Sequence, residues 1–483
     1  MKKNKVLMNE EHEKVKNSKQ ENYEATGWMD ESRKKELLDV KKIENTDGTI
    51  FGLEDGGEHI ISLPQNSIFN KNITVYGDDY SGTSEYFIIN QILQCSKRGE
   101  SVIITDTMGK IYSDTSKYLK NLGYNIKVFN LVDPQYSNSW NCLNEITKSK
   151  DQVELMTQTF CDTIIKNTLS IRLDSTFSNI EMSLLKALCL YVAMDNNRDE
   201  KDKSIETIYG LLTSCSYAQL SILFSQLPLS HPALPDWHVF AQNEESIKKN
   251  IIAILALRLH VFQSDLVRKI TQFNEINLEE PGKSKCAYYI IMPDQKSTLN
   301  SLSSLFLSFL FIKLIKYADT YGIGCKCEVP VNFILNDFTN IGQISDFTKR
   351  LSTIRSRDLR VAVIFKKITE LQDSYPNGLW EEIICNCDTQ LFLGCTDSKT
   401  AEFISERIGQ TIAKIPSIFN EETKTFAKYV LTSDEILKLN NNLALVILRG
   451  QKAFKVKKFD FKNHPLSIYL KRSSVKDYIP QQR

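Results

Sequence analysis

Two glycines five residues apart, Gly77 and Gly82, lie in a turn that joins the apolar run 73–76 to a stretch with apolar residues at helical spacing. In a phosphate-binding loop, G-x-x-x-x-G-K-[ST], glycines let backbone N–H groups turn onto a phosphate, the lysine reaches the β- and γ-oxygens, and Ser or Thr binds Mg²⁺. Here Ser84 keeps the last position, but Thr83 replaces the lysine. The spacing therefore predicts the frame of a phosphate-binding loop without its main positive charge.

Two acidic residues inside the loop, Asp78 and Asp79, would further repel a triphosphate. Taken alone, such a segment has two interpretations: a nucleotide site, or a tight turn between a strand and a helix in an α/β protein. The rest of the sequence has to distinguish them.

The composition is that of an ordinary globular protein: 483 residues, 42% hydrophobic and 25% charged, are enough for two or three domains. The net charge of +1, from 60 basic and 59 acidic residues, gives no overall electrostatic argument for nucleic-acid binding. The 11 cysteines are odd in number and scattered, which favours a reducing, cytosolic environment. The pairs Cys325/Cys327 and Cys385/Cys387 have one-residue gaps and no nearby histidine, which indicates thiols rather than a zinc site.

Apolar runs of strand length alternate with helical periodicity on both sides of a long helical region. Continuous apolar runs with short connections are typical of buried parallel strands, so we predict an α/β fold with a mostly parallel, doubly wound sheet. The predicted strands are 73–76, 102–105, 125–131, 286–291, 332–335, 360–365 and 389–393, the predicted helices are 84–95, 113–122, 302–315, 344–356 and 400–408, and hairpins are predicted at 49–63 and 443–461.

These patterns divide the chain into parts with different composition. They are a polar, mobile arm at 1–48, a first α/β part at 49–144, an inserted all-α domain at 145–272, a second α/β part with a closing hairpin at 273–470, and a basic, frayed tail at 471–483. The most apolar run, 302–315, is shorter than the roughly 20 residues that cross a bilayer and contains Lys313. We therefore predict a helix buried against the sheet and no transmembrane segment.

Several short segments follow one another in a fixed order along nearly the whole chain after about residue 50. They are 112–134 with Ser139-Trp140-Asn141, Asn336-Asp337-Phe338-Thr339-Asn340-Ile341-Gly342 with 353–357, 386–388 with 392–394 and 400–405, and 432–436 with Arg449-Gly450. In type and spacing they resemble the coupling proteins of type IV secretion and conjugation systems, the TraG/TraD group. The segment that begins at Asn336 resembles the Walker B segment of that family.

The resemblance implies a RecA-like P-loop NTPase fold with an inserted all-α domain, usually assembled as a membrane-bound hexamer that uses ATP to pass DNA or protein into a secretion channel. Gly77, Gly82, Thr83 and Ser84 would then bind the nucleotide, and Ser84 and Asp337 would bind Mg²⁺. The implied partners are the conjugation or secretion machinery, the relaxosome and single-stranded DNA.

The chain departs from the family where the chemistry takes place. The aspartate that holds Mg²⁺ through water is replaced by Asn336, and the acidic base that activates the attacking water is shortened to Asp337. Lys366 stands where a polar sensor is expected, and the family's Asp-Pro-Lys-Gly-Glu reads Asp-Thr-Met-Gly-Lys at 106–110. Since losing one preorganised donor costs roughly 3 to 4 kcal/mol, about 10²- to 10³-fold in rate, we expect ATP hydrolysis to be weak or absent.

Two ways to compensate for these changes stay open. The catalytic candidates are therefore Asn336, Asp337, Lys366, Arg355 and Arg357. Lys366 could reach the γ-phosphate while Asp337 binds Mg²⁺ in place of Asn336, or Lys366 could be solvated or neutralise the acidic loop. Arg355 and Arg357 could supply a finger to a neighbouring subunit, or could lie on the exposed side of a helix.

The favoured function is a coupling-protein-like component of a conjugative system, impaired in ATP hydrolysis, that acts in substrate recognition or regulation through 145–272. That region could instead only pack within an oligomer. The alternatives are an active DNA-translocating ATPase that uses Asp337, Ser84 and Lys366, and the folded but inactive product of a decaying gene copy. The expected location is the cytoplasm, or the inner face of the bacterial membrane through partners. The chain is then either a naturally soluble relative or one whose membrane part is missing from this sequence.

Overall fold

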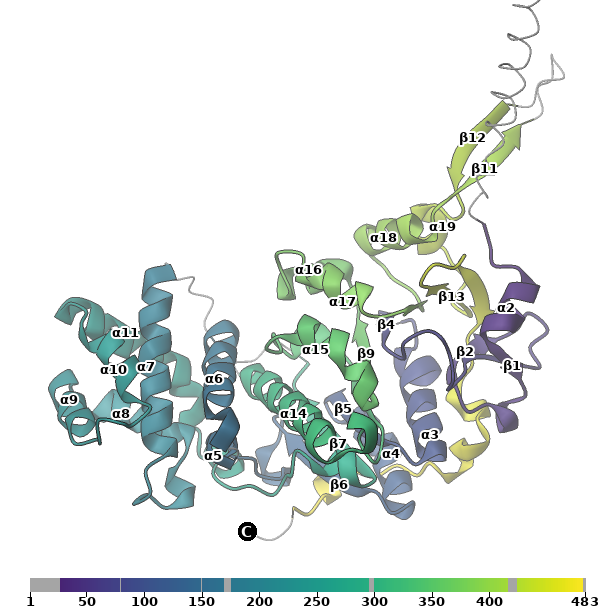
Figure 1. Ribbon diagram of the computed structural model, residues 1–483. Coiled ribbons are helices and arrows are strands. Elements are labelled where there is room, and N and C mark those ends of the chain that lie inside the picture. Colours follow the sequence, from purple (N-terminus) through teal and green to yellow (C-terminus); the bar gives the residue numbers. More distant parts are fainter. Residues whose placement is uncertain are drawn as a thin grey trace, which may run out of the picture.

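The computed structural model describes residues 27–78, 80–148, 150–168, 175–294, 299–415 and 424–480. Within these residues, one sheet of 12 strands runs through the molecule (Figure 1). In spatial order its strands are β1 (Asp39–Lys41), β3 (Ile60–Leu63), β2 (Thr49–Leu53), β14 (Phe454–Lys457), β13 (Leu443–Leu448), β10 (Thr389–Phe392), β4 (Ile73–Tyr76), β9 (Leu359–Phe365), β8 (Val331–Leu335), β5 (Ser101–Thr107), β7 (Cys286–Met292) and β6 (Asn125–Asn130).

The strands from β10 to β6 are parallel to one another, and those from β1 to β13 in the spatial order extend the sheet with antiparallel pairing. Every residue of β4, β7 and β8 is buried. Strands that are covered on both faces need apolar side chains on both, which is why they read as continuous apolar runs in the sequence. The predicted α/β fold with a mostly parallel sheet is confirmed.

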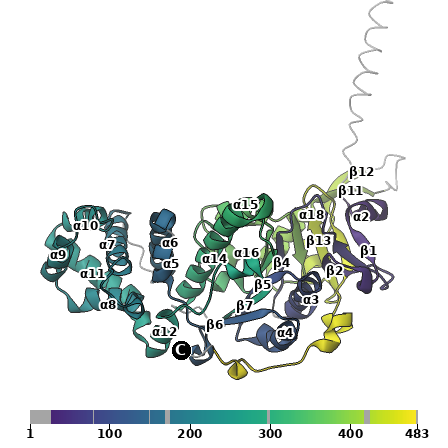
Figure 2. The same cartoon turned by 60° about the horizontal axis from the view of Figure 1, so that its bottom comes forward.

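Helices cover both faces of this sheet (Figure 2). One face carries the π-helical turn η2 (Ser84–Ile88), α3 (Ile89–Arg98) and α4 (Lys110–Asn121); the other carries α14 (Asn300–Tyr321), α15 (Phe347–Thr353), η9 (Ile354–Arg357), α16 (Ile368–Ser374), α17 (Leu379–Cys385) and α18 (Ser398–Ile408). Successive side chains of a strand point to opposite faces. Ile103 therefore belongs to the core that includes α14, whereas Ile104 belongs to the core under α3.

The predicted apolar helix α14 is buried against the sheet, as expected. Lys313, which interrupts its apolar run, is 3% exposed, and its ammonium lies 3.5 Å from the carboxylate of Glu145. Among the described residues, α14 is the one unbroken helix with the length and composition to cross a bilayer, and 89% of its most apolar window is buried in the fold. A second candidate, 245–263 with 265–271, passes the same test only if its two parts are joined across an 87° bend.

Between β6 and β7 the described residues form helices joined by loops, with no strand. The helices are α5 (Cys142–Lys148), α6 (Val153–Asn167), α7 (Ser175–Ala193), α8 (Ile205–Ser214), α9 (Tyr217–Ser225), α10 (Leu234–Ala241), α11 (Glu245–Leu259), α12 (Asp265–Thr271) and α13 (Glu280–Lys283). A buried ion pair joins α7 to α11: the side chains of Glu181 and Arg258 are 0% and 3% exposed, with 2.5 Å between Oε1 and Nε. Arg258 also donates to the carbonyl oxygen of Thr168 and thereby ties α6 to the same cluster. The assignment of 145–272 as a separate domain stays a prediction.

The N-terminal segment differs from the mobile arm predicted for 1–48. Residues 31–41 form α2 (Glu31–Leu37) and β1, and β1 pairs with β3 at the edge of the sheet. Met29 and Leu38 are 6% and 4% exposed, so two apolar side chains anchor an otherwise polar segment. The prediction is wrong for residues 29–48, and residues 1–26 lie outside the described part.

The C-terminal tail predicted at 471–483 is packed on the helical layer up to residue 480. The N–H of Ser473 donates to the carbonyl of Ser113 in α4 at 2.9 Å, and the Tyr478 hydroxyl donates to Asn138. The prediction of a frayed tail is therefore wrong for the described residues 471–480, because hydrogen bonds to α4 and to Asn138 hold this segment despite its basic composition. Residues 481–483 lie outside the described part.

A second, two-stranded sheet was not predicted from the sequence. β11 (Gln410–Ile415) and β12 (Lys424–Tyr429) pair in antiparallel fashion and project from the body between α18 and α19 (Ser433–Leu437) (Figure 1).

Asp106 fixes the start of α4 after β5. Its carboxylate accepts hydrogen bonds from the N–H groups of Ile111 at 3.0 Å and Tyr112 at 2.7 Å, which the first turn of a helix cannot satisfy internally. Asp106 is 1% exposed, and burial raises its pKa to about 7, although the two N–H groups act in the opposite direction.

The raised pKa of Asp106 predicts a pH-dependent contribution to stability. Between its unfolded pKa of about 3.9 and its folded pKa of about 7, the folded protein keeps a proton that the unfolded chain has released. The stability from Asp106 is therefore present at low pH and lost as pH rises through 7. Asp106→Asn stays neutral but keeps only one of the two accepting oxygens, so its Tm should lie below that of the wild type near pH 4, and the deficit should shrink or reverse by pH 8.

Thermal unfolding of both proteins across this range measures the effect, with Asp434→Asn as the control because Asp434 is exposed in the first turn of α19. An Asp106→Asn difference in Tm that is the same at pH 4 and pH 8 would contradict the prediction.

Candidate functional site

The ends of four parallel strands surround a pocket of about 400 Å³ at the carboxyl edge of the sheet. It is lined by Gly77, Asp78, Gly82, Thr83, Ser84, Glu85, Asp106, Thr107, Lys110, Ile111, Asp294, Asn336, Asp337, Ile364, Phe365 and Lys366. The structure thus brings together the loop residues, the Walker B-like pair and Lys366, all of which the sequence nominates. Their roles in chemistry stay predictions.

The loop after β4 has the steric features of a phosphate-binding loop. Gly82 has φ of +73°, and a Cβ at this position would lie 2.4 Å from the ring of Tyr86, so a side chain is excluded. A Cβ on Gly77 would lie 2.3 Å from Oγ1 of Thr83, because the threonine hydroxyl folds back over the start of the loop. That hydroxyl is also within 3.2 Å of Oγ of Ser81. The short side chain at the lysine position therefore contacts other residues of the loop.

Asp78 accepts hydrogen bonds from backbone N–H groups of its own loop. Its Oδ1 accepts the N–H of Tyr80 at 3.1 Å, and its carbonyl accepts the N–H of Ser81 at 3.2 Å. One carboxylate oxygen of the protein thereby takes a loop N–H group of the kind that binds a phosphate oxygen in other loops. Asp79, the second acidic residue of the loop, lies outside the described residues.

Asp337 is surrounded by groups of its own chain. Its Oδ2 accepts from the hydroxyl of Thr107 at 2.5 Å and from Nδ2 of Asn336 at 3.2 Å, while Nζ of Lys366 lies 3.7 Å from Oδ1. The side chain is 14% exposed, and its backbone is in the left-handed region with φ of +47°. This arrangement favours the interpretation of Lys366 as a neutralising lysine, with Asp337 as one of its partners.

The charges that line the pocket are mainly negative. The pocket has five carboxyl groups, those of Asp78, Glu85, Asp294, Asp337 and Asp106, and two lysines; the raised pKa of Asp106 leaves its carboxyl group partly protonated near pH 7. One of the lysines, Lys110, lies 3.1 Å from Glu85, so its charge is already opposed. The pocket therefore offers a triphosphate less positive charge than it needs.

Arg355 and Arg357 lie at the opposite edge of the sheet. Both belong to η9, which precedes the first residue of β9, whereas the pocket lies at the end of that seven-residue strand, roughly 20 Å away. Arg357 is bound to Asp319 with N–O distances of 2.8 and 2.9 Å, and Arg355 donates to the carbonyl of Ile68 at 3.3 Å. They do not line this chain's own pocket, and a role toward a neighbouring subunit stays a prediction.

Lys458, which the sequence analysis did not nominate, contacts the outside of the loop. Its Nζ donates to the carbonyl of Ser81 at 2.9 Å and to Oδ1 of Asn441 at 3.2 Å. The residue is 8% exposed, and burial lowers its pKa to about 8 while Asp78 raises it. Its sequence surroundings, Lys-Val-Lys-Lys, gave no signal that one of these lysines is buried.

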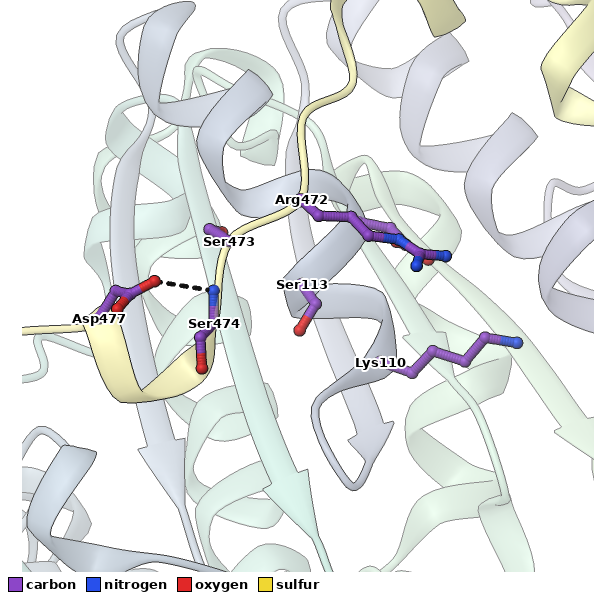
Figure 3. A pocket seen from close by; sticks show the side chains of 7 residues that line it. Lys110, Ser113, Arg472, Ser473, Ser474 and Asp477 are labelled. Atoms are coloured by element: carbon purple, nitrogen blue, oxygen red, sulfur yellow. Dashed lines mark hydrogen bonds and ion pairs between the residues drawn. The ribbon is translucent and has the colours of Figure 1, made fainter.

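A second hollow of about 510 Å³ lies beside the pocket, between α4 and the C-terminal segment (Figure 3). Arg472 and Lys110 point to the same side of this hollow, and Nε of Arg472 lies 3.0 Å from Oδ1 of Asp114. Asp477 accepts the N–H of Ser474 at 3.0 Å. Since two basic and two acidic side chains balance here, the hollow has no charge preference for a ligand.

Comparisons with known proteins give both a family and a fold. Residues 18–479 match the family described as type IV secretory system conjugative DNA transfer. The bacterial conjugative coupling protein TrwBdeltaN70, in complex with sulphate, aligns with a TM-score of 0.67 and 15% identity over 90% of this chain and 93% of its own. The plasmid coupling protein TrwB in complex with ADP and Mg²⁺ has the same TM-score and identity, over 90% and 94%.

VirB4 of Thermoanaerobacter pseudethanolicus aligns with a TM-score of 0.56 and 12% identity, over 87% of this chain and 98% of its own. No curated protein matches the chain. At such low identities the structural alignments establish a shared fold, and the family follows from the match over nearly the whole sequence. The chain is therefore a member of the type IV secretory system conjugative DNA transfer family.

Proposed function

We propose that this chain is a coupling-protein-like component of a conjugative type IV secretion system in which ATP hydrolysis is weak or absent. Its helical region, 145–272, would recognise a transfer substrate or a partner protein. The coupling role rests on family membership. The observation that supports the loss of hydrolysis is the charge of the pocket, which has two lysines against four carboxyl groups and a fifth, Asp106, that is partly protonated near pH 7.

The residues that line the pocket fit a Mg²⁺-bound triphosphate poorly. Thr83 has no charge for the β- and γ-oxygens, and Asn336 presents an amide where a carboxylate is needed near Mg²⁺. Among the described residues, none of the buried side-chain polar atoms that lack a hydrogen-bond partner lines this pocket.

The helical region carries exposed apolar side chains that suit contacts with other proteins. Leu229, Leu257, Ile222 and Val239 are 97, 61, 57 and 51% exposed. Proteins of the secretion machinery or the relaxosome are the partners proposed for this surface, with single-stranded DNA as a further ligand of the assembly. Through these partners the chain would act at the cytoplasmic face of the membrane. Packing within a hexamer of this chain is the alternative use of the same side chains.

A second function, an active ATP-driven DNA translocase, is favoured by one observation. Lys110 and Lys366 both line the pocket, so a relocated lysine is available there. Asp337 and Ser84 would then hold Mg²⁺. Against this function, Nζ of Lys366 lies 3.7 Å from Asp337 and Nζ of Lys110 lies 3.1 Å from Glu85, so each lysine has an acidic neighbour that competes with a phosphate.

The proposal predicts that the purified chain turns over ATP slowly or not at all. Enzymes typically turn over at 1 to 10³ s⁻¹, and each lost donor removes about 10²- to 10³-fold, so we expect a rate below about 0.01 s⁻¹. The assay is phosphate release with Mg²⁺, with and without single-stranded DNA, beside a Lys366→Ala variant. Turnover that Lys366→Ala abolishes would overturn the proposal and make Lys366 a relocated catalytic lysine.

Restoring the missing charge should restore nucleotide binding. The double variant Thr83→Lys/Asn336→Asp supplies a lysine to the phosphates and a carboxylate beside Mg²⁺, and one charged hydrogen bond alone is worth about 1.5 to 3 kcal/mol. We expect Mg²⁺-ATP affinity to rise by at least about tenfold in calorimetry. Thr83→Met/Asn336→Asp is the control, because methionine has a similar length and no charge. An equal gain in the control, or no gain in either variant, would show that charge at position 83 is not what the pocket lacks.

A further inference from the structure

We propose that Lys458 is a positioning residue for residues 80–84 of the loop: from outside the pocket it holds the Ser81–Gly82 peptide so that the N–H of Gly82 faces the pocket. Asn441 supports it. The inference concerns the shape of the loop without a nucleotide, so it holds or fails independently of whether the chain hydrolyses ATP.

The antiparallel hairpin β13–β14 brings Lys458 to the loop. Asn441 comes two residues before β13, and Lys458 directly follows β14. The N–H of Lys458 donates to the carbonyl of Asn442 at 2.8 Å, so the open end of the hairpin is closed by a backbone hydrogen bond. β13 pairs with β10, and β10 with β4, the strand that leads into the loop. The hairpin and the loop are therefore parts of one sheet, and their separation is fixed.

The ammonium of Lys458 contacts the loop in a buried setting. It donates to the carbonyl of Ser81 at 2.9 Å and to Oδ1 of Asn441 at 3.2 Å, and it lies 5.2 Å from the centroid of the Tyr86 ring. Nδ2 of Asn441 in turn donates to the carbonyl of Tyr80 at 3.4 Å. Two successive loop carbonyls thus point outward to side chains of the hairpin. Hydrogen bonds from a charged donor are among the stronger ones in proteins, especially where water is excluded.

The planar peptide bond transmits this contact to the pocket. In a trans peptide the C=O of one residue and the N–H of the next point in opposite directions, and the described chain has no cis peptide bonds. Since the carbonyl of Ser81 points outward to Lys458, the N–H of Gly82 points inward. Gly82 lines the pocket, so its N–H faces the space where an anion would be held. Lys458 therefore fixes the direction of one cradle N–H, and it does so without a lysine at position 83.

A lysine that only tied the hairpin together would have a different effect. Its loss would loosen β13 and β14, whereas the loss of a loop-positioning residue would loosen 80–86 and leave the strands protected. Lys457 is the matched control: it neighbours Lys458, is exposed, and donates to the carbonyl of Asp55 at 2.9 Å, away from the loop.

Hydrogen exchange measured by mass spectrometry on the full chain, with no nucleotide added, tests the proposal. Lys458→Met should speed exchange in peptides that cover 80–86 by about tenfold, the effect of losing one hydrogen bond from a charged donor, while peptides of β4 and β13 change little. Lys458→Arg keeps a charged donor and should restore most of the protection, and Lys457→Met should match the wild type.

Unchanged exchange in 80–86 for Lys458→Met, or an equal increase throughout β13 and β14, would overturn the proposal. If Lys458→Met does not fold, Asn441→Ala provides the second test, since Asn441 is exposed and its removal leaves the hairpin backbone intact. Asn441→Ala should raise exchange in the same peptides by a smaller factor, and no increase there would likewise overturn the proposal.

Discussion

The parallel register of β4, β9, β8 and β5 is the constraint on which the pocket depends. Tyr76 pairs with Phe365, Leu335 with Val363 and also with Thr105, so these strands end at one edge of the sheet. The loops after these strands come from positions between 77 and 366 of the sequence, yet they meet because hydrogen bonds between the strands leave little freedom in where each one ends. The chemistry of the pocket is therefore decided by the few residues directly after each strand.

The structure separates the shape of the phosphate-binding loop from its charge. The shape depends on Gly82, whose positive φ and missing Cβ allow the Tyr86 ring to lie against it, and on hydrogen bonds to the outer carbonyls of the loop. Neither requirement involves position 83. The positive charge of the loop, by contrast, depends on the single side chain at position 83, and the threonine there carries none. The loop can therefore keep its shape whichever side chain stands at position 83.

The continuous apolar runs are sufficient to predict the parallel strands, and the resemblance to the coupling proteins adds that Thr83, Asn336 and Lys366 belong to one site. The sequence is not sufficient to predict the partners or the burial of a side chain that packs against distant segments. Nothing near Arg357 indicates its pairing with Asp319, and nothing near Lys458 indicates its burial, since both depend on segments that are distant in sequence. The packed tail was missed for the same reason: its hydrogen bonds go to α4 and to Asn138, which are distant from it in sequence.

The polar groups of the pocket satisfy one another, and this bears on whether the departures are random. Asp78 accepts a loop N–H, Asp106 accepts two N–H groups of α4, and Asp337 is bound by Thr107, Asn336 and Lys366. Buried polar atoms without a hydrogen-bond partner occur instead in the core beneath the pocket, where Oδ1 of Asn332 in β8 and the side-chain amide of Gln94 in α3 have none. Such atoms destabilise a fold, because they lose hydrogen bonds to water without a replacement. The altered positions, Asn336 and Lys366, both contact Asp337 directly, so the pocket accommodates them as a connected set rather than as isolated substitutions.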